Sequence, residues 1–174
     1  MVFPEHSERV LPEKTWATDT TKGLRKKNII NSLYIKPDVL EKINFERYAR
    51  YAEVEAKEAR YEGYLLEDAE LVITAYGATS RISRNAVNAL RAKGIKAGLL
   101  RPITLWPFPK DAYKSAAKTA KAFLTVEMSM GQMIEDVRLA IDCLRPVHFC
   151  GRTGGMIPTP GEIEAKAEEI ARDF

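Results

Sequence analysis

The residues that could take part in chemistry follow short apolar segments of the chain. The first group is Gly77, Thr79, Ser80 and Arg81, directly after the apolar run 71–76. Two hydroxyls and an arginine at the start of a helix could hold an anion, because the first N–H groups of a helix are free. Nucleotide-binding loops need further glycines or a Gly-Lys-Ser/Thr sequence, which this segment lacks. The pattern favours a plain turn capped by Thr79 or Ser80, with a phosphate or carboxylate site as the alternative.

A second group lies in the segment Arg101-Pro-Ile-Thr-Leu-Trp-Pro-Phe-Pro109. Its prolines keep the chain out of a helix, so Trp106 and Phe108 offer large apolar areas on a rigid turn. Arg101, which precedes Pro102, could clamp a carboxylate or a phosphate, although such an arginine more often orders a turn or bridges subunits. We interpret this segment as a good docking element and a poor catalyst.

Glu127 ends a third apolar run and is followed by Gly131 and Gln132. A glutamate acts as an acid or base when its pKa is raised, but no histidine or cysteine lies near Glu127 in the sequence to form a pair. Met128, Met130 and Met133 would form a soft apolar patch that suits an interface. These residues therefore favour an interface or capping role, with catalysis as the alternative.

The sequence predicts two helix N-termini, one directly after Glu127 and one near the end of the chain. Ser129 and Gln132 have the spacing of a capping box, and Thr159-Pro-Gly-Glu162 has the same spacing with a proline at the first helical position. Gly154 and Gly155 supply a backbone turn before the second helix, which is a possible point of approach for another chain.

Cysteine and histidine are too sparse for a metal centre. Cys143 and Cys150 stand seven residues apart, and neither His6 nor His148 has a partner at ligand spacing. These spacings exclude an iron–sulfur cluster or a structural zinc held by this chain alone. They also provide no serine or cysteine triad. We expect no metal site, no catalytic residue in the chain by itself, and two buried free thiols in a reducing cytoplasm.

Length and composition indicate an ordinary globular protein. The chain has 174 residues, 45% of them hydrophobic and 29% charged, with a formal net charge of +3. This length fits one domain with an appendage. No basic block with interleaved aromatics marks a nucleic-acid face, no apolar run is long enough to span a membrane, and the start does not resemble a signal peptide. We expect a cytoplasmic protein with neither nucleic acid nor membrane as a partner.

The first part of the chain is predicted to be a connector. Residues 1–37 are weakly periodic and rich in polar and proline residues, which predicts an extended linker. A linker helix is expected within 38–66, capped by Asp38, running to about Tyr61 and closed by Gly63. Its apolar stripe includes Tyr48 and Ala52, and the small alanines would let the helix lie close against a partner.

Residues 67–174 read as alternating strands and helices. Strands are expected at 71–76, 95–100, 122–127 and 146–150, the last of them at an edge of the sheet, and helices between and after them. Such alternation predicts an α/β domain in three layers, a parallel sheet covered by helices on both faces through right-handed crossovers.

Four segments carry a family resemblance. They are Tyr76-Gly-Ala, Arg101 to Pro109, Val126-Glu-Met-Ser-Met-Gly-Gln-Met-Ile-Glu-Asp-Val-Arg138 and Gly151-Arg-Thr-Gly-Gly155. Together they resemble the α subunit of 2-oxoacid:ferredoxin oxidoreductases, of the branched-chain (2-ketoisovalerate) or 2-oxoglutarate type. The linker with Trp16 is also similar, so the resemblance extends over nearly the whole chain.

The resemblance implies a fold similar to the transketolase C-terminal domain. It also implies a multi-subunit enzyme of anaerobic metabolism that decarboxylates a 2-oxoacid, such as pyruvate, on thiamine diphosphate with Mg. In this family the acyl group passes to coenzyme A, and iron–sulfur clusters pass electrons to ferredoxin. The implied partners are a thiamine-binding β subunit, a γ subunit and a ferredoxin-like δ subunit.

The resemblance also implies that this chain has an assembly role. Family α subunits have a thiamine-binding domain before this one, so we expect Met1 to begin a truncated or split version of such a subunit. We expect the chain to bind no cofactor alone, to be inactive alone, and to hold domains and subunits in register. The contact surfaces would be 101–109 and 127–132. The competing hypothesis is a non-enzymatic regulatory module that binds an anion at Gly77–Arg81.

Overall fold

The computed structural model describes residues 8, 10–20 and 22–174, which form two compact units, residues 1–46 and 47–174. The first histidine, His6, lies outside the described residues. In the first unit the described residues before Pro37 form no helix or strand, and the amide of Asn28 donates to the carbonyls of Thr15 and Ala17. Trp16 is exposed there.

Helix α1 (Pro37–Glu58) carries Asp38 in its first turn and has no buried residue. The sequence predicted that this helix would run to about Tyr61 and close at Gly63. The structure instead ends it at Glu58 and forms strand β1 (Tyr61–Tyr64). The strand was missed because it is mostly exposed and lacks the apolar run of a buried strand, and because it depends on pairing with the distant strand β3 (Ala97–Pro102).

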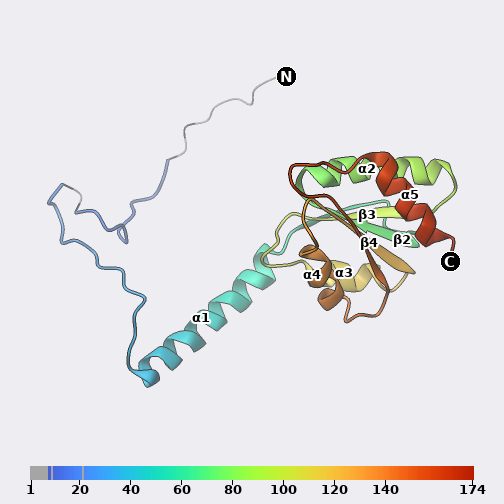
Figure 1. Cartoon of the computed structure of the whole chain (residues 1–174). Coiled ribbons are helices and arrows are strands. Elements are labelled where there is room, and N and C mark those ends of the chain that lie inside the picture. Colours follow the sequence, from blue (N-terminus) through green and yellow to red (C-terminus); the bar gives the residue numbers. More distant parts are fainter. Residues whose placement is uncertain (1–7, 9, 21) are drawn as a thin grey trace. The chain divides into compact units, whose positions relative to one another are not determined.

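The second unit is an α/β domain. Its remaining elements are β2 (Leu71–Thr74), α2 (Gly77–Ala92), α3 (Lys110–Ala116), β4 (Ala122–Glu127), α4 (Met133–Ala140), β5 (Val147–Gly151) and α5 (Pro160–Ala171). The sheet order is β1-β3-β2-β4-β5, in which β1 pairs antiparallel with β3 and every other pair is parallel. Helices α2 and α5 cover one face and α3 and α4 the other (Figure 1), which confirms the predicted three-layer α/β class.

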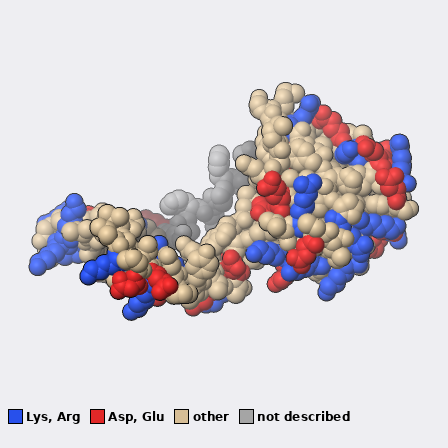
Figure 2. Space-filling view, turned by 60° about the horizontal axis from the view of Figure 1, so that its bottom comes forward, with Lys and Arg blue, Asp and Glu red and all other residues tan. Residues whose placement is uncertain are grey.

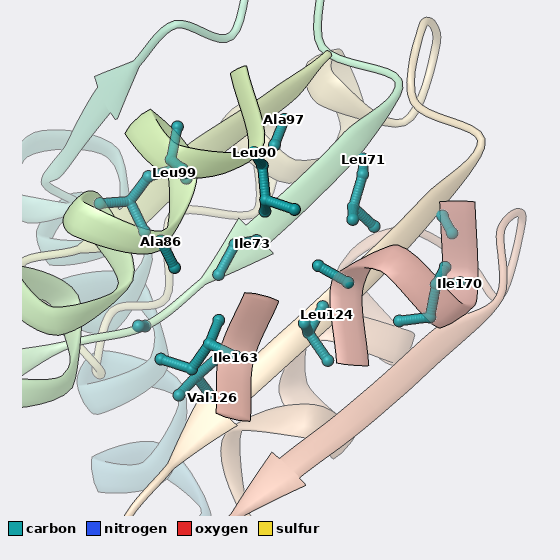
Figure 3. Close-up of a cluster of buried hydrophobic side chains, with 14 residues drawn as sticks. Leu71, Ile73, Ala86, Leu90, Ala97, Leu99, Leu124, Val126, Ile163 and Ile170 are labelled. Atoms are coloured by element: carbon teal, nitrogen blue, oxygen red, sulfur yellow. The ribbon is translucent and has the colours of Figure 1, made fainter. Parts of the chain in front are cut away.

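Alternation of side chains along the strands builds two cores. Leu71 and Ile73 of β2 face α2 and α5, whereas Val72 between them faces α3 and α4. Figure 3 shows the first core, in which Leu90 of α2 and Ile163 of α5 meet side chains of the sheet. Central strands are buried on both faces, which explains why β2 and β4 read as continuous apolar runs.

The second unit has no charge segregation on the face that Figure 2 shows. Lysine and arginine side chains alternate there with aspartate and glutamate, as the near-balanced composition predicts. Among the described residues no helix is both long and apolar enough to cross a membrane.

Candidate functional site

The predicted anion group stands at the end of β2. Gly77 has a left-handed backbone (φ 58°) and begins α2, but the capping residue is Tyr76, whose side chain makes no cap hydrogen bond. The expectation that Thr79 or Ser80 caps the helix is therefore wrong. Both hydroxyls donate backwards, from Thr79 to the Tyr76 carbonyl and from Ser80 to the Gly77 carbonyl, each at 2.7 Å. Both residues are buried, and Arg81 is exposed.

Arg101 forms a cross-strand ion pair. Its Nη1 lies 3.0 Å from the carboxylate of Glu62, the residue opposite it in the β1–β3 register. The other oxygen of Glu62 lies 3.5 Å from Arg84 of α2, whose guanidinium also stacks over the ring of Tyr64 at 4.1 Å. Arg101 thus fastens the antiparallel edge strand, while Pro102 ends β3 as a buried residue.

The turn after Pro102 is held to Arg60, in the link between α1 and β1. The main-chain nitrogens of Ile103 and Thr104 donate to the Arg60 carbonyl at 2.9 and 3.2 Å, and the Thr104 hydroxyl accepts from the Arg60 nitrogen at 2.9 Å. The same hydroxyl donates to the Pro107 carbonyl at 2.8 Å. These bonds fix the path of the chain on both sides of the aromatic residues.

The two aromatic residues of this turn have different environments. Phe108 stacks on the buried ring of Tyr113 with centroids 4.8 Å apart, so it belongs to the core beneath α3. Trp106 is 58% exposed, and its ring and the ring of Tyr51 make a T-shaped contact at a centroid distance of 5.5 Å. Of the two, only Trp106 offers a large free surface.

Trp106 forms one wall of an open groove. We call it the α1–Trp106 groove, a cavity of about 680 Å³ lined by Tyr48, Tyr51, Ala52, Glu55 and Trp106. Sequence reasoning placed Tyr48 and Ala52 on an apolar stripe but did not identify Tyr51 or Glu55. The signal available was spacing, since steps of three and four residues place side chains on one helical face.

Glu127 is the most buried charged residue among those described, at 1% exposure. Its carboxylate accepts from the main-chain nitrogens of Gln132, Met133 and Ile134 at 2.9 to 3.1 Å. It also accepts from the Ser129 hydroxyl at 2.9 Å. Glu127 therefore caps α4 from the end of β4, at a helix end that favours negative charge.

This cap replaces the predicted capping box of Ser129 and Gln132. Helix α4 begins at Met133, and its capping residue Gln132 makes no side-chain cap bond. The expected patch of three methionines is also wrong in part, because Met133 is buried at 2% exposure while Met128 and Met130 are exposed. The pKa of Asp136 in the first turn is raised, first by partial burial and then by the charge of Glu127.

Glycine lets the Glu127–Gln132 segment pass close to β5. Gly131 has a left-handed backbone (φ 105°), and a Cβ there would lie 3.2 Å from the Ile134 side chain of α4 and 3.5 Å from the Phe149 ring of β5. A Cβ on Gly151 would lie 2.8 Å from the Ser129 carbonyl.

Gly154 and Gly155 form the expected turn, with φ of 63° and 86°. The capping box of Thr159 and Glu162 is confirmed in both directions.

The cysteines do not gather at a site. Cys143 is exposed, which corrects the expectation of two buried thiols, and Cys150 is half-buried in β5. Burial raises the pKa of the Cys150 thiol. Within residues 8, 10–20 and 22–174, no three histidine, cysteine or acidic side chains are placed to hold a metal ion.

Sequence comparison finds a family and curated relatives. Residues 69–163 match the family model of pyruvate:ferredoxin oxidoreductase core domain II. Over 171 residues the chain is 43% identical to ketoisovalerate oxidoreductase subunit VorB of Methanothermobacter thermautotrophicus, covering 98% of this chain and 48% of that protein. It is 36% identical to 2-oxoglutarate synthase subunit KorA of Methanothermobacter marburgensis over 97 residues, which are 56% of this chain and 26% of that one.

Structural comparison finds the same fold in larger proteins. A 2-oxoglutarate:ferredoxin oxidoreductase from Magnetococcus marinus aligns with a TM-score of 0.65 and 23% identity, over 78% of this chain and 24% of that one. A split-gene transketolase aligns with a TM-score of 0.54 and 20% identity, over 63% and 40% of the two chains. These likenesses show a transketolase-type fold. The chain spans about half the length of the VorB relative. It belongs to the pyruvate:ferredoxin oxidoreductase core domain II family.

Proposed function

We propose that this chain is the core domain II portion of the α subunit of a cytoplasmic, multi-subunit 2-oxoacid:ferredoxin oxidoreductase. The holoenzyme would decarboxylate a 2-oxoacid with thiamine diphosphate and Mg and transfer the acyl group to coenzyme A. Electrons would leave through iron–sulfur clusters to ferredoxin. In this proposal the chain holds the thiamine-binding domains and the other subunits in register and does not turn over substrate alone.

The observation that supports this role is the presentation of Trp106. The turn that bears the Trp106 indole follows β3 and is fixed by the hydrogen bonds of Thr104 with Arg60 and with the Pro107 carbonyl. An indole that is 58% exposed on so well anchored a turn has a low entropic cost of docking. Exposed Ile103 and Leu105 extend the apolar surface beside it.

The residues present do not fit the cofactors of the proposed holoenzyme. A four-cysteine cluster needs more thiolates than Cys143 and Cys150 can supply, and these two lie apart on an exposed turn and on β5. Glu127, the buried carboxylate in the described residues, is already saturated by four donors. The proposal therefore assigns the thiamine and cluster sites to other domains and subunits.

Co-expression tests the proposal. The 174-residue chain would be produced with the remaining half of a VorB-type α subunit and with the β, γ and δ subunits, then analysed by size exclusion. We expect a stable complex that reduces a viologen acceptor with 2-oxoacid and coenzyme A, whereas the chain alone gives no turnover. Activity of the isolated chain, or its failure to join the complex, would contradict the proposed role.

The regulatory-module hypothesis can be tested on the same material. Its anion site would use the hydroxyls of Thr79 and Ser80, but both hydroxyl protons are already donated to main-chain carbonyls. These contacts favour the assembly role over the module. Tight calorimetric binding of phosphate or of an acyl-coenzyme A by the isolated chain would reverse that preference.

A further inference from the structure

The α1–Trp106 groove combines aromatic walls with a carboxylate. The rings of Tyr48 and Tyr51 are tilted by 55° with centroids 6.0 Å apart, and those of Tyr51 and Trp106 are nearly perpendicular, at 80°. Because the rings are not parallel, their π faces point in different directions along the wall of the groove. Glu55, four residues after Tyr51 on α1, also lines this groove.

The charge of Glu55 is available for a ligand. Its neighbours on α1 are already in ion pairs: Glu53 lies 3.5 Å from Lys57, and Glu58 lies 2.6 Å from Arg60. Over the residues that the structure describes, the side chain of Glu55 has no ion-pair or hydrogen-bond partner. Of Glu53, Glu55 and Glu58, the one without an ion-pair partner is therefore Glu55, which lines the groove.

The groove continues into a second cavity, whose lining combines apolar residues with the charged Lys110 and Asp111. This second cavity, of about 480 Å³, shares Ala52 and Glu55 with the first and is lined further along by Tyr61, Phe108 and Pro109. A lone cation would fill only the aromatic end. A polypeptide segment that carries one cationic side chain between apolar residues would fill both parts.

We propose that the α1–Trp106 groove binds an arginine side chain presented by a partner polypeptide, with apolar residues of the same segment packed along the second cavity. The planar guanidinium can stack on the ring of Tyr51 or of Trp106, with the other ring nearly perpendicular beside it, and pair with the Glu55 carboxylate at its edge. Lysine lacks the planar, stacking surface. This inference rests on the proposed function only in treating the groove as an assembly surface.

A peptide titration tests it in the full-length chain. Trp16→Phe leaves Trp106 as the one tryptophan, since the sequence has two. The emission of Trp106 would be followed while acetyl-Leu-Arg-Leu-amide is added, and again with citrulline or lysine in place of arginine. We expect saturable binding of the arginine peptide, and binding of the neutral citrulline peptide weaker by about fivefold or more.

A matched pair of variants assigns the effect to the groove. Glu55→Gln should weaken binding of the arginine peptide by about fivefold and leave the citrulline peptide unchanged. Glu53→Gln makes the same charge change on the same helix outside the groove and should have little effect. Circular dichroism would confirm that both variants fold.

Three results would overturn the inference: no saturable change in Trp106 emission, equal binding of the citrulline or lysine peptide, or equal losses from Glu55→Gln and Glu53→Gln. None of these results bears on whether the chain joins the co-expressed complex. Failure of the arginine site and failure of the assembly role are therefore distinguishable.

Discussion

The carboxylate of Glu127 accepts a hydrogen bond of 3.0 Å from the main-chain nitrogen of Ile134, which joins the last residue of β4 to the first turn of α4. Three further donors complete the shell of this carboxylate. The segment Glu127–Gln132, which is part of the family resemblance, therefore has a structural role: its buried carboxylate fixes the start of α4.

Replacing Glu127 should destabilise the domain. Glu127→Gln turns one acceptor oxygen into a donor that faces N–H groups, and we expect the free energy of unfolding to fall by about 3 kcal/mol. Urea denaturation followed by circular dichroism measures this. The control is Glu135→Gln, on the exposed side of the same first turn, which should cost less than about 1 kcal/mol. Equal costs at the two positions would contradict the capping role.

Two cross-strand threonines should respond differently to the same substitution. Thr74 and Thr125 are partners in the β2–β4 register and both are buried. Thr74 shares a hydrogen bond with the Tyr113 hydroxyl, whereas Oγ1 of Thr125 has no partner among the described residues. Thr74→Val should cost about 1–2 kcal/mol, and Thr125→Val should be neutral or stabilising. Urea unfolding of both variants checks the difference, and an equal loss at Thr125 would show that its hydroxyl is satisfied.

Alkaline pH should weaken the fold through Tyr113. Burial raises the pKa of its phenol, the hydrogen bond with Thr74 acts in the opposite direction, and the charge of Asp136 raises it further. The folded state then holds the proton more tightly than the unfolded chain, so this stabilisation is present below about pH 10 and is lost above it. The loss from this group should approach about 1.4 kcal/mol per pH unit. Urea unfolding between about pH 9 and 11 should show a smaller slope in Tyr113→Phe, and equal slopes would exclude Tyr113 as the source.

Substitution of Trp106 should impair assembly, whereas substitution of Phe108 should impair folding stability. Trp106→Ala removes an exposed ring, so we expect a change below about 1 kcal/mol in stability together with loss of the chain from the co-expressed complex. Phe108→Ala removes the ring that stacks on Tyr113 and should cost about 3 kcal/mol. Leu139→Ala, at a residue that is 73% exposed on α4, is the control for loss of surface apolar area. Retention of the Trp106→Ala chain in the complex would exclude the turn as a contact surface.

Local sequence was sufficient for the features whose causes are local. The apolar run 122–127 forms β4 with the predicted bounds, because a central parallel strand is apolar on both faces. Thr159 and Glu162 form the predicted capping box, because both of its bonds are made within one turn of helix. Alternation of such elements determined the α/β class, and four short segments determined the family resemblance.

Contacts between distant residues decided the rest. The partner of Arg101 is Glu62, which lies on strand β1. No local sequence pattern predicts this strand, because it forms by pairing with β3. Glu127 could be assigned to a cap, an interface or catalysis until the fold placed the first turn of α4 over its carboxylate. The α1–Trp106 groove likewise unites residues more than fifty positions apart along the chain. Sequence patterns report what a residue requires of its neighbours, whereas the packing of the sheet and helices determines which distant residue meets that requirement.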